Sequence, residues 1–284
     1  MITVLESIRL STQYLSEKGI DSPRTNAELL LAGIIGCKRL ELYLFFDRPL
    51  SEIELKQYRE FLKRRGNFEP LQYILGTVEF YGLELNVDSN VLIPRPETEI
   101  LVETIIKQYS KEQQIIILDV GCGSGNISVA LAVNLQLAKI YSTDISNGAL
   151  AVAKKNSEKF NIQGRINFIK HNILKDSLDN LPLFNVIVSN PPYVSKESYA
   201  ELQKEIRNFE PREAVTDEKD GYTFFKAITE AASIRLKENG KLFFEIAQGQ
   251  SDVVKNILME NKFSNIRVIK DYQGIDRVIF GERI

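Results

Sequence analysis

The chain is poor in histidine, cysteine and tryptophan: among 284 residues there are one histidine, two cysteines and no tryptophan. With a single histidine, His171, the chain has too few histidines for a metal site built from histidine ligands, so we expect no metal. A Ser-His or Cys-His catalytic nucleophile is nearly excluded for the same reason. His171 follows a strand-like run, and we expect it to be solvated. Cys37 and Cys122 occur in unrelated segments, which argues against a disulfide framework and for a cytoplasmic location.

Net charge and long apolar runs are also lacking. The 36 basic and 38 acidic side chains give a formal net charge of -2, so no overall field attracts nucleic acid or an anionic membrane. No apolar run approaches the roughly 20 residues of a membrane helix, and the start of the chain lacks the pattern of a signal peptide. We therefore expect neither nucleic acid nor membrane as a partner. As a separate expectation, we take the protein to be a monomer.

The periodicity of the sequence changes twice, which predicts two domains joined by a linker. Residues 1–75 show helical spacing, with stops at Gly19 and Gly36 and a cap at Ser51, so we expect a helical bundle. Residues 76–93 form the linker, where apolar residues alternate around VDSN as in a β-hairpin. Residues 94–284 form the larger domain.

Strand-like and helix-like segments alternate in the larger domain. This predicts an α/β fold with a doubly wound, mainly parallel seven-stranded sheet covered by helices on both faces. The last two strands have no room for a helix between them, so we expect an antiparallel pair at one edge. The strand candidates are 115–120, 139–144, 166–170, 185–190, 241–246, 265–270 and 277–282.

The first motif with chemical meaning is LDVGCGSGN, at the turn from the first of these strands into a helix. Glycines allow a tight turn and a close approach of a ligand to the backbone. The third glycine of a dinucleotide fingerprint would stand at Asn126, so the pattern departs from that of nicotinamide enzymes. Asp144 ends the next strand, where a carboxylate can accept hydrogen bonds from both ribose hydroxyls, although it can also serve as a helix cap.

Asp119, directly before the glycines, indicates which nucleoside is bound. A carboxylate there repels pyrophosphate and suits a ligand that carries an ammonium and a sulfonium group. S-adenosylmethionine has both, and it brings its own activated methyl group. We therefore expect this cofactor, with S-adenosylhomocysteine as the product.

The second motif is the tetrapeptide Asn190-Pro191-Pro192-Tyr193, which ends a buried strand. In a doubly wound sheet this strand lies beside the first one, so the tetrapeptide faces the glycine turn. The Asn190 side-chain oxygen and the Pro191 carbonyl can hold both N–H bonds of a planar amide and aim its lone pair at a methyl group, while Tyr193 covers the flat group. We therefore assign substrate binding and catalysis to Asn190, Pro191, Pro192 and Tyr193.

These residues resemble the class I S-adenosylmethionine-dependent methyltransferases with an NPPY motif. ILDVGCGSGN, IVSNPPYV, PRPETE, FEPRE and DYQGIDRVIFGE are together similar to the HemK/PrmC family, which methylates the glutamine of the GGQ motif in bacterial class 1 peptide chain release factors. The resemblance implies a Rossmann-like fold and an N-terminal bundle that docks the release factor. It also implies cofactor contacts at Thr98, Asp119, Gly121, Cys122, Gly123, Ser124, Gly125, Asp144, Ile145, Asn172, Ile173 and Asn190.

Other functions remain open from the residues alone. An adenine-N6 methyltransferase on DNA or RNA uses the same tetrapeptide, but the pI of about 5.8 and the lack of a basic, aromatic-rich face argue against it. A ribosomal-protein glutamine methyltransferase would be expected to differ after Arg95. A binding module without catalysis would be expected to have a degenerate glycine turn or NPPY, and both are intact.

Overall fold

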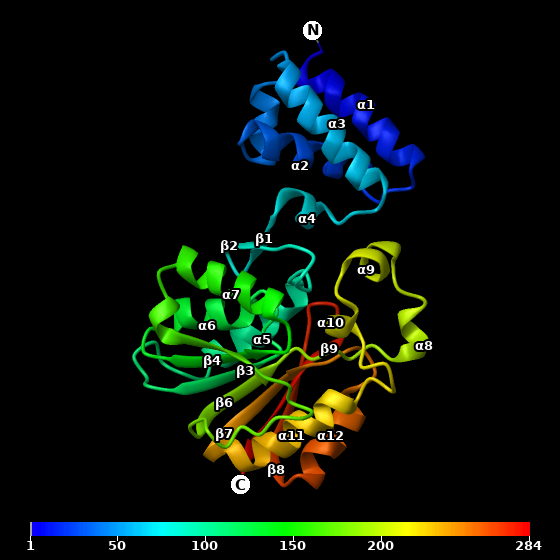
Figure 1. The fold of residues 1–284 in the computed structure, drawn as a ribbon. Helices are drawn as coiled ribbons and strands as arrows, with labels where there is room; N and C mark the ends of the chain where they lie inside the picture. Colours follow the sequence, from blue (N-terminus) through cyan, green and yellow to red (C-terminus); the bar gives the residue numbers. More distant parts are fainter. Residues whose placement is uncertain (1) are drawn as a thin grey trace. The chain divides into compact units, whose positions relative to one another are not determined.

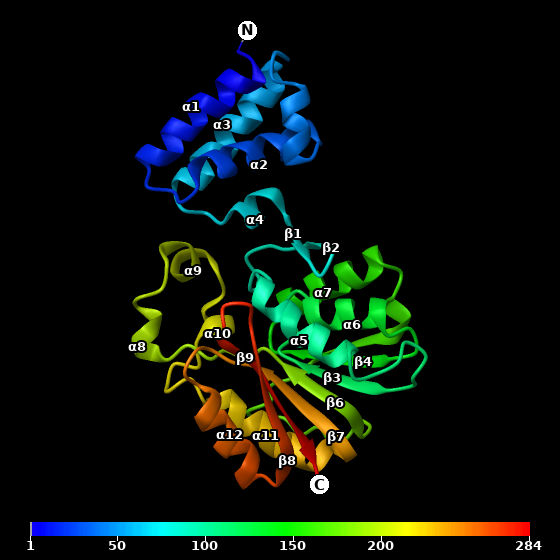
Figure 2. The same cartoon turned by 180° about the vertical axis from the view of Figure 1, so that it is seen from behind.

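A computed structural model describes residues 2–284, and the chain divides into two compact units. The smaller unit comprises the N-terminal segment up to Thr77 together with residues 203–209. The larger unit comprises residues 78–202 and 210–284. Figures 1 and 2 show the course of the chain from two sides.

The smaller unit is helical, as the periodicity predicts. The Ser51 side chain accepts a hydrogen bond from the Glu54 amide, and the Glu54 carboxylate accepts one from the Ser51 amide, which forms a capping box. Gly36 ends one helix in the left-handed conformation, with φ 77°. The helices are α1 (Val4–Glu17), α2 (Pro23–Ile35), the 3-10 helix η1 (Arg39–Leu44), α3 (Glu52–Gly66), α4 (Leu71–Leu75) and α9 (Lys204–Phe209).

A buried arginine ties α9 to the rest of the smaller unit. The Arg65 side chain is 5% exposed, and its guanidinium donates to Asn26 Oδ1 at 2.7 Å and to Glu205 Oε1 at 2.6 Å. The Glu69 carbonyl accepts a third hydrogen bond, at 3.0 Å. A charge that has been removed from water is stable only with such partners, so this ion pair fixes where α9 lies within the unit.

Replacing Arg65 should therefore destabilise the protein. Arg65→Met leaves the carboxylate of Glu205 and the buried amide of Asn26 without their donor, and we expect a loss of about 3 kcal/mol in the free energy of unfolding. Urea denaturation followed by circular dichroism measures it. Arg64→Met is the matched control, because Arg64 pairs with Glu69 at a more exposed position and should cost less than about 1 kcal/mol. Equal losses of stability in the two variants would contradict the conclusion that Arg65 stabilises the protein through its buried hydrogen bonds.

The hairpin forms, but its turn is not where the sequence pattern places it. Strands β1 (Thr77–Phe80) and β2 (Leu83–Asn86) are joined by Tyr81 and Gly82, whose φ angles of 50° and 71° give a tight two-residue turn. The expectation of a hairpin around VDSN is wrong, because VDSN follows β2. The Asp88 carboxylate accepts from the Asn90 amide, and this separate local turn explains the misleading signal.

The larger unit is built on a seven-stranded sheet of order β5-β4-β3-β6-β7-β9-β8. The pairs from β5 to β7 are parallel, and β9 runs antiparallel to both β7 and β8. Both features confirm the predicted sheet and its antiparallel edge. The strands are β3 (Ile116–Val120), β4 (Lys139–Asp144), β5 (Ile166–Lys170), β6 (Phe184–Ser189), β7 (Leu236–Glu245), β8 (Phe263–Lys270) and β9 (Asp276–Arg283).

Helices cover both faces of this sheet, as Figures 1 and 2 show. On one face α5 (Pro96–Ile106), α6 (Asn126–Asn134) and α7 (Asn147–Lys159) lie against the sheet, and the core there contains Ile117, Val186 and Phe243. On the other face α11 (Thr223–Arg235) and α12 (Ser251–Glu260) pack on Leu118, Ile187 and Phe244. Neighbours along each strand thus alternate between two apolar cores, as a doubly covered sheet requires.

The strand order positions the site. The chain leaves β3 towards β4 on one side and later returns to place β6 on the other side of β3, so the carboxyl ends of β3 and β6 meet where the order reverses. Ligands bind at this point in open α/β sheets. None of the helices in residues 2–284 is long and apolar enough to cross a membrane.

Candidate functional site

A cavity of about 200 Å³ opens at the carboxyl ends of β3, β4 and β6. It brings together segments that are far apart in the sequence: the start of α5, the glycine turn, the ends of β4 and β5, and the NPPY tetrapeptide. The sequence-predicted residues that line it are Thr98, Gly121, Cys122, Gly123, Ser124, Asp144, Ile145, Asn172, Ile173, Asn190, Pro191 and Pro192. Such a largely preformed cavity with converging polar groups is typical of a small-molecule site.

The glycine turn presents bare backbone to the cavity. Gly121 and Gly123 have φ angles of 74° and 53°, and no atom lies within 4 Å of the point where a Cβ would stand. A side chain there would occupy the space that a ligand needs. Gly125 has another reason to be glycine, because a Cβ would stand 3.0 Å from the Ala153 Cβ of α7. It packs the turn against a helix and does not line the cavity.

Asp144, at the end of β4, holds the turn and faces the cavity. Its Oδ2 accepts from the Gly123 amide at 2.9 Å, and its Oδ1 accepts from the Ser146 amide at 2.9 Å. Each oxygen keeps a further lone pair for a ligand hydroxyl. Burial raises the pKa of this carboxyl, whereas the backbone hydrogen bonds lower it. The two carboxylate oxygens therefore fit a ribose diol as hydrogen-bond acceptors.

Asp119 lies behind the turn and not in the cavity wall. Its side chain is fully buried, and its Oδ2 accepts from Ser128 Oγ at 2.6 Å. Burial raises the pKa of Asp119 to about 7, and Oδ1 has no partner among the described residues. The expected contact with a cofactor ammonium group stays a prediction, while its position supports the first turn of α6.

Asn190 is oriented by a neighbour from α5. Its side-chain NH₂ donates to the hydroxyl of Thr98 at 3.2 Å, and Thr98 is only 1% exposed. With the nitrogen engaged in this way, the oxygen of the Asn190 amide is available to accept from a substrate. This is the orientation that the proposed grip on a planar amide needs. The predicted cofactor contact of Thr98 stays a prediction.

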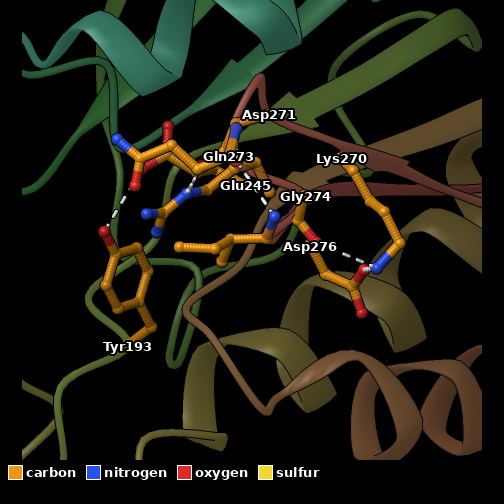
Figure 3. Close-up of polar contacts among 9 residues, drawn as sticks. Tyr193, Glu245, Lys270, Asp271, Gln273, Gly274 and Asp276 are labelled. Carbon is orange, nitrogen blue, oxygen red and sulfur yellow. Dashed lines mark hydrogen bonds and ion pairs between the residues drawn. The ribbon is translucent and has the colours of Figure 1, made fainter.

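Tyr193 is held at both ends of the residue. Its hydroxyl donates to Glu245 Oε1 at 3.2 Å, as Figure 3 shows, and its backbone carbonyl accepts from the Gln250 side chain at 3.1 Å. Gly221 closes over the same carbonyl, because a Cβ at Gly221 would lie 2.5 Å from that oxygen. Tyr193 does not line the cavity itself, and its expected role in covering the substrate amide stays a prediction.

The sequence pattern missed other residues of the site. His171 lines the cavity, and both ring nitrogens are buried without a partner among the described residues, so the expectation of a solvated histidine is wrong. Glu210, from FEPRE, is buried and binds the Ile93 amide and the Arg95 guanidinium, which anchors the start of PRPETE. Nothing in a single sequence indicates that these distant segments meet.

Comparison with known proteins identifies the family. The family described as PrmC N-terminal domain matches residues 6–76, and the one described as methyltransferase small domain matches residues 96–208. A release factor glutamine methyltransferase of Chlorobaculum tepidum is 37% identical over 97% of this chain and 95% of its own length. The chain belongs to the release factor glutamine methyltransferase family.

A second relative agrees with this family, and a solved structure agrees in fold. The relative in Fusobacterium nucleatum, of the same printed name, is 38% identical over 98% of this chain and 78% of its own length. A methyltransferase from Pyrococcus furiosus has a solved structure with a TM-score of 0.53 and 19% identity, covering 72% of this chain and 90% of that one. The latter likeness concerns the fold alone, and it supports the methyltransferase architecture of the larger unit.

Proposed function

We propose that this protein transfers a methyl group from S-adenosylmethionine to the side-chain amide nitrogen of the glutamine in the GGQ motif of class 1 peptide chain release factors. The observation that carries the proposal is Asn190, whose amide is turned by Thr98 so that its oxygen can accept from a substrate. The family membership of the chain supports the substrate class. We place the reaction in the cytoplasm and treat the protein as a monomer that acts on neither nucleic acid nor membrane.

The residues around the cavity suit the cofactor. Open space beside Gly121 and Gly123 receives the methionine part, and the Asp144 carboxylate accepts from the ribose hydroxyls. Ile145, Asn172 and Ile173 are the candidates for the adenine. When bound, S-adenosylmethionine supplies an electrophilic methyl group on a sulfonium, so the protein needs to supply only binding and orientation.

Orientation is the main task, because an amide nitrogen is a poor nucleophile. Its lone pair is delocalised into the carbonyl group. Two acceptors, the Asn190 oxygen and the Pro191 carbonyl, would hold both N–H bonds and direct the lone pair towards the methyl group, and this positioning can lower the barrier by up to roughly 7–11 kcal/mol. Asn190 cannot take up a proton at neutral pH, so the proton leaves to water after transfer.

The direct test incubates the purified protein with S-adenosylmethionine and a purified bacterial release factor. Mass spectrometry of the digested factor should find one added methyl group, and fragmentation should place it on the glutamine of GGQ. A release factor with that glutamine replaced by alanine is the control, and it should stay unmodified. Methylation of the control, or of adenine in added DNA or RNA, would refute the proposed substrate.

A further inference from the structure

A buried carboxylate, that of Glu245, lies beside the NPPY tetrapeptide. Glu245 is the last residue of β7 and only 2% exposed. In the parallel pair of β6 and β7, Ser189 is opposite Phe244, so Glu245 and Asn190 follow at the same level of neighbouring strands. The tetrapeptide and this carboxylate therefore leave the sheet side by side.

Two hydroxyl groups, those of Tyr193 and Thr98, lie next to the carboxylate of Glu245. Oε1 accepts from the Tyr193 hydroxyl at 3.2 Å (Figure 3). The Thr98 hydroxyl lies close enough to lower the pKa of the carboxyl, although Oε2 has no partner of good geometry among the described residues. Thr98 in turn holds the NH₂ group of Asn190. The Glu245 carboxylate thus contacts Tyr193 directly and lies next to Thr98, which contacts Asn190.

No basic side chain forms an ion pair with this carboxylate in the described part of the chain. Arg277, from β9, approaches it, but the Arg277 Nε is bound to Asp271 Oδ2 at 2.9 Å in the turn between β8 and β9. The other charged neighbour, Glu97 from α5, repels it. A buried acid with an incomplete set of partners costs free energy that an apolar residue would avoid, and such groups are concentrated at functional sites.

We propose that Glu245 is a positioning residue of the methyl transfer, which holds Tyr193 by its hydroxyl and Asn190 through Thr98. The proposal rests on the proposed function. Its physical basis is the direction of hydrogen bonds: an ionised carboxylate can only accept, so both hydroxyls point their hydrogens at it. The oxygen of Thr98 then faces Asn190 as an acceptor, which keeps the Asn190 oxygen turned towards the substrate.

The test compares Glu245→Gln with Glu238→Gln, a control on an exposed residue of the same strand. The neutral amide accepts only on its oxygen and carries two donor hydrogens on its nitrogen, so a hydroxyl hydrogen that points at the nitrogen loses its acceptor. We expect kcat to fall about 10-fold to 100-fold in Glu245→Gln. The KM for the release factor and the calorimetric Kd for S-adenosylmethionine should stay within about twofold, because ground-state binding is not changed. The control should match the natural protein.

The pH profile separates positioning from a merely structural role. Burial raises the pKa of Glu245 to about 7, and the groups that face it are Thr98 and Glu97 from α5, Tyr193, and Arg277 from β9. The ionised form exists above this pKa, so kcat of the natural protein should fall as the pH drops below about 7. Glu245→Gln should lose this dependence. A dependence due to Asp119 would remain in the variant.

A second variant tests the same chain of contacts from the other side. Thr98→Val removes the hydroxyl at nearly constant volume, and kcat should fall as in Glu245→Gln. In the double variant, kcat should fall by a much smaller factor than the product of the two single fold-losses. Both substitutions interrupt the same chain of contacts, so their effects are not independent. This variant also decides the matter if Glu245→Gln does not fold. An unchanged kcat or an unchanged pH profile in a folded Glu245→Gln overturns the inference, whereas an inactive natural protein overturns the proposed function.

Discussion

Asn190→Ala should reduce methyl transfer to the release factor by about 100-fold to 1,000-fold, because it removes an acceptor that aligns the nucleophile in the transition state. The cofactor cavity should stay intact, since Asn190 is one of many residues that line it. Initial rates with radioactive S-adenosylmethionine measure the loss, and calorimetry should find the affinity for the cofactor changed by less than about tenfold.

Asn256→Ala is the matched control for this variant. Asn256 is an exposed residue of α12, and removing its amide should leave the rate unchanged. If Asn190→Ala still transferred the methyl group at the natural rate, the role assigned to the tetrapeptide would be refuted. Loss of cofactor binding together with activity would mean that Asn190 acts on the cofactor and not on the amide.

Asp144→Ala should have the opposite effect to Asn190→Ala, because its main consequence should be weaker binding of the cofactor. The variant removes the expected acceptor of two ribose hydroxyls and also releases the Gly123 amide, which Asp144 holds at 2.9 Å. Hydrogen bonds to a charged group contribute about 1.5–3 kcal/mol each, so we expect the Kd for S-adenosylmethionine to rise at least about 100-fold.

Calorimetry with S-adenosylmethionine and with S-adenosylhomocysteine checks this result, and both ligands should weaken equally because they share the ribose. Asp252→Ala, at an exposed carboxylate of α12, serves as the control. If Asp144→Ala binds the cofactor as the natural protein does, Asp144 only caps α7 and the turn, which is the alternative that its position in the sequence leaves open.

The strands of the larger unit were predictable because each is a short apolar run that ends in a polar or turn residue. The predicted runs match the sheet to within one residue for β3, β4, β5 and β6, and β7 begins five residues earlier than expected, at Leu236. Topology rules then place β6 beside β3 without further information. The meeting of the glycine turn and the NPPY tetrapeptide therefore follows from the sequence.

The direction of individual side chains was less predictable. The position of Asp119 before the glycines does not reveal that one of its carboxylate oxygens accepts from Ser128 of α6. His171 reads as solvated because it follows a strand, yet it lines the cavity. For Glu245 the sequence holds one indication of a special role. The residue directly follows the apolar residues LFF, and a carboxylate buried at the end of such a strand costs free energy unless the fold supplies partners. Its partners Thr98 and Tyr193 come from distant segments, which a single sequence does not reveal.

The grouping of α9 with the N-terminal helices has a consequence for any attempt to exchange domains between relatives. Cutting at Thr77 would leave Arg65 in one fragment and Glu205 in the other, so neither fragment would contain a complete N-terminal unit. A chimaera that borrows its N-terminal helices from another species therefore has to borrow residues 203–209 as well, or restore the arginine–glutamate pair by matched substitutions.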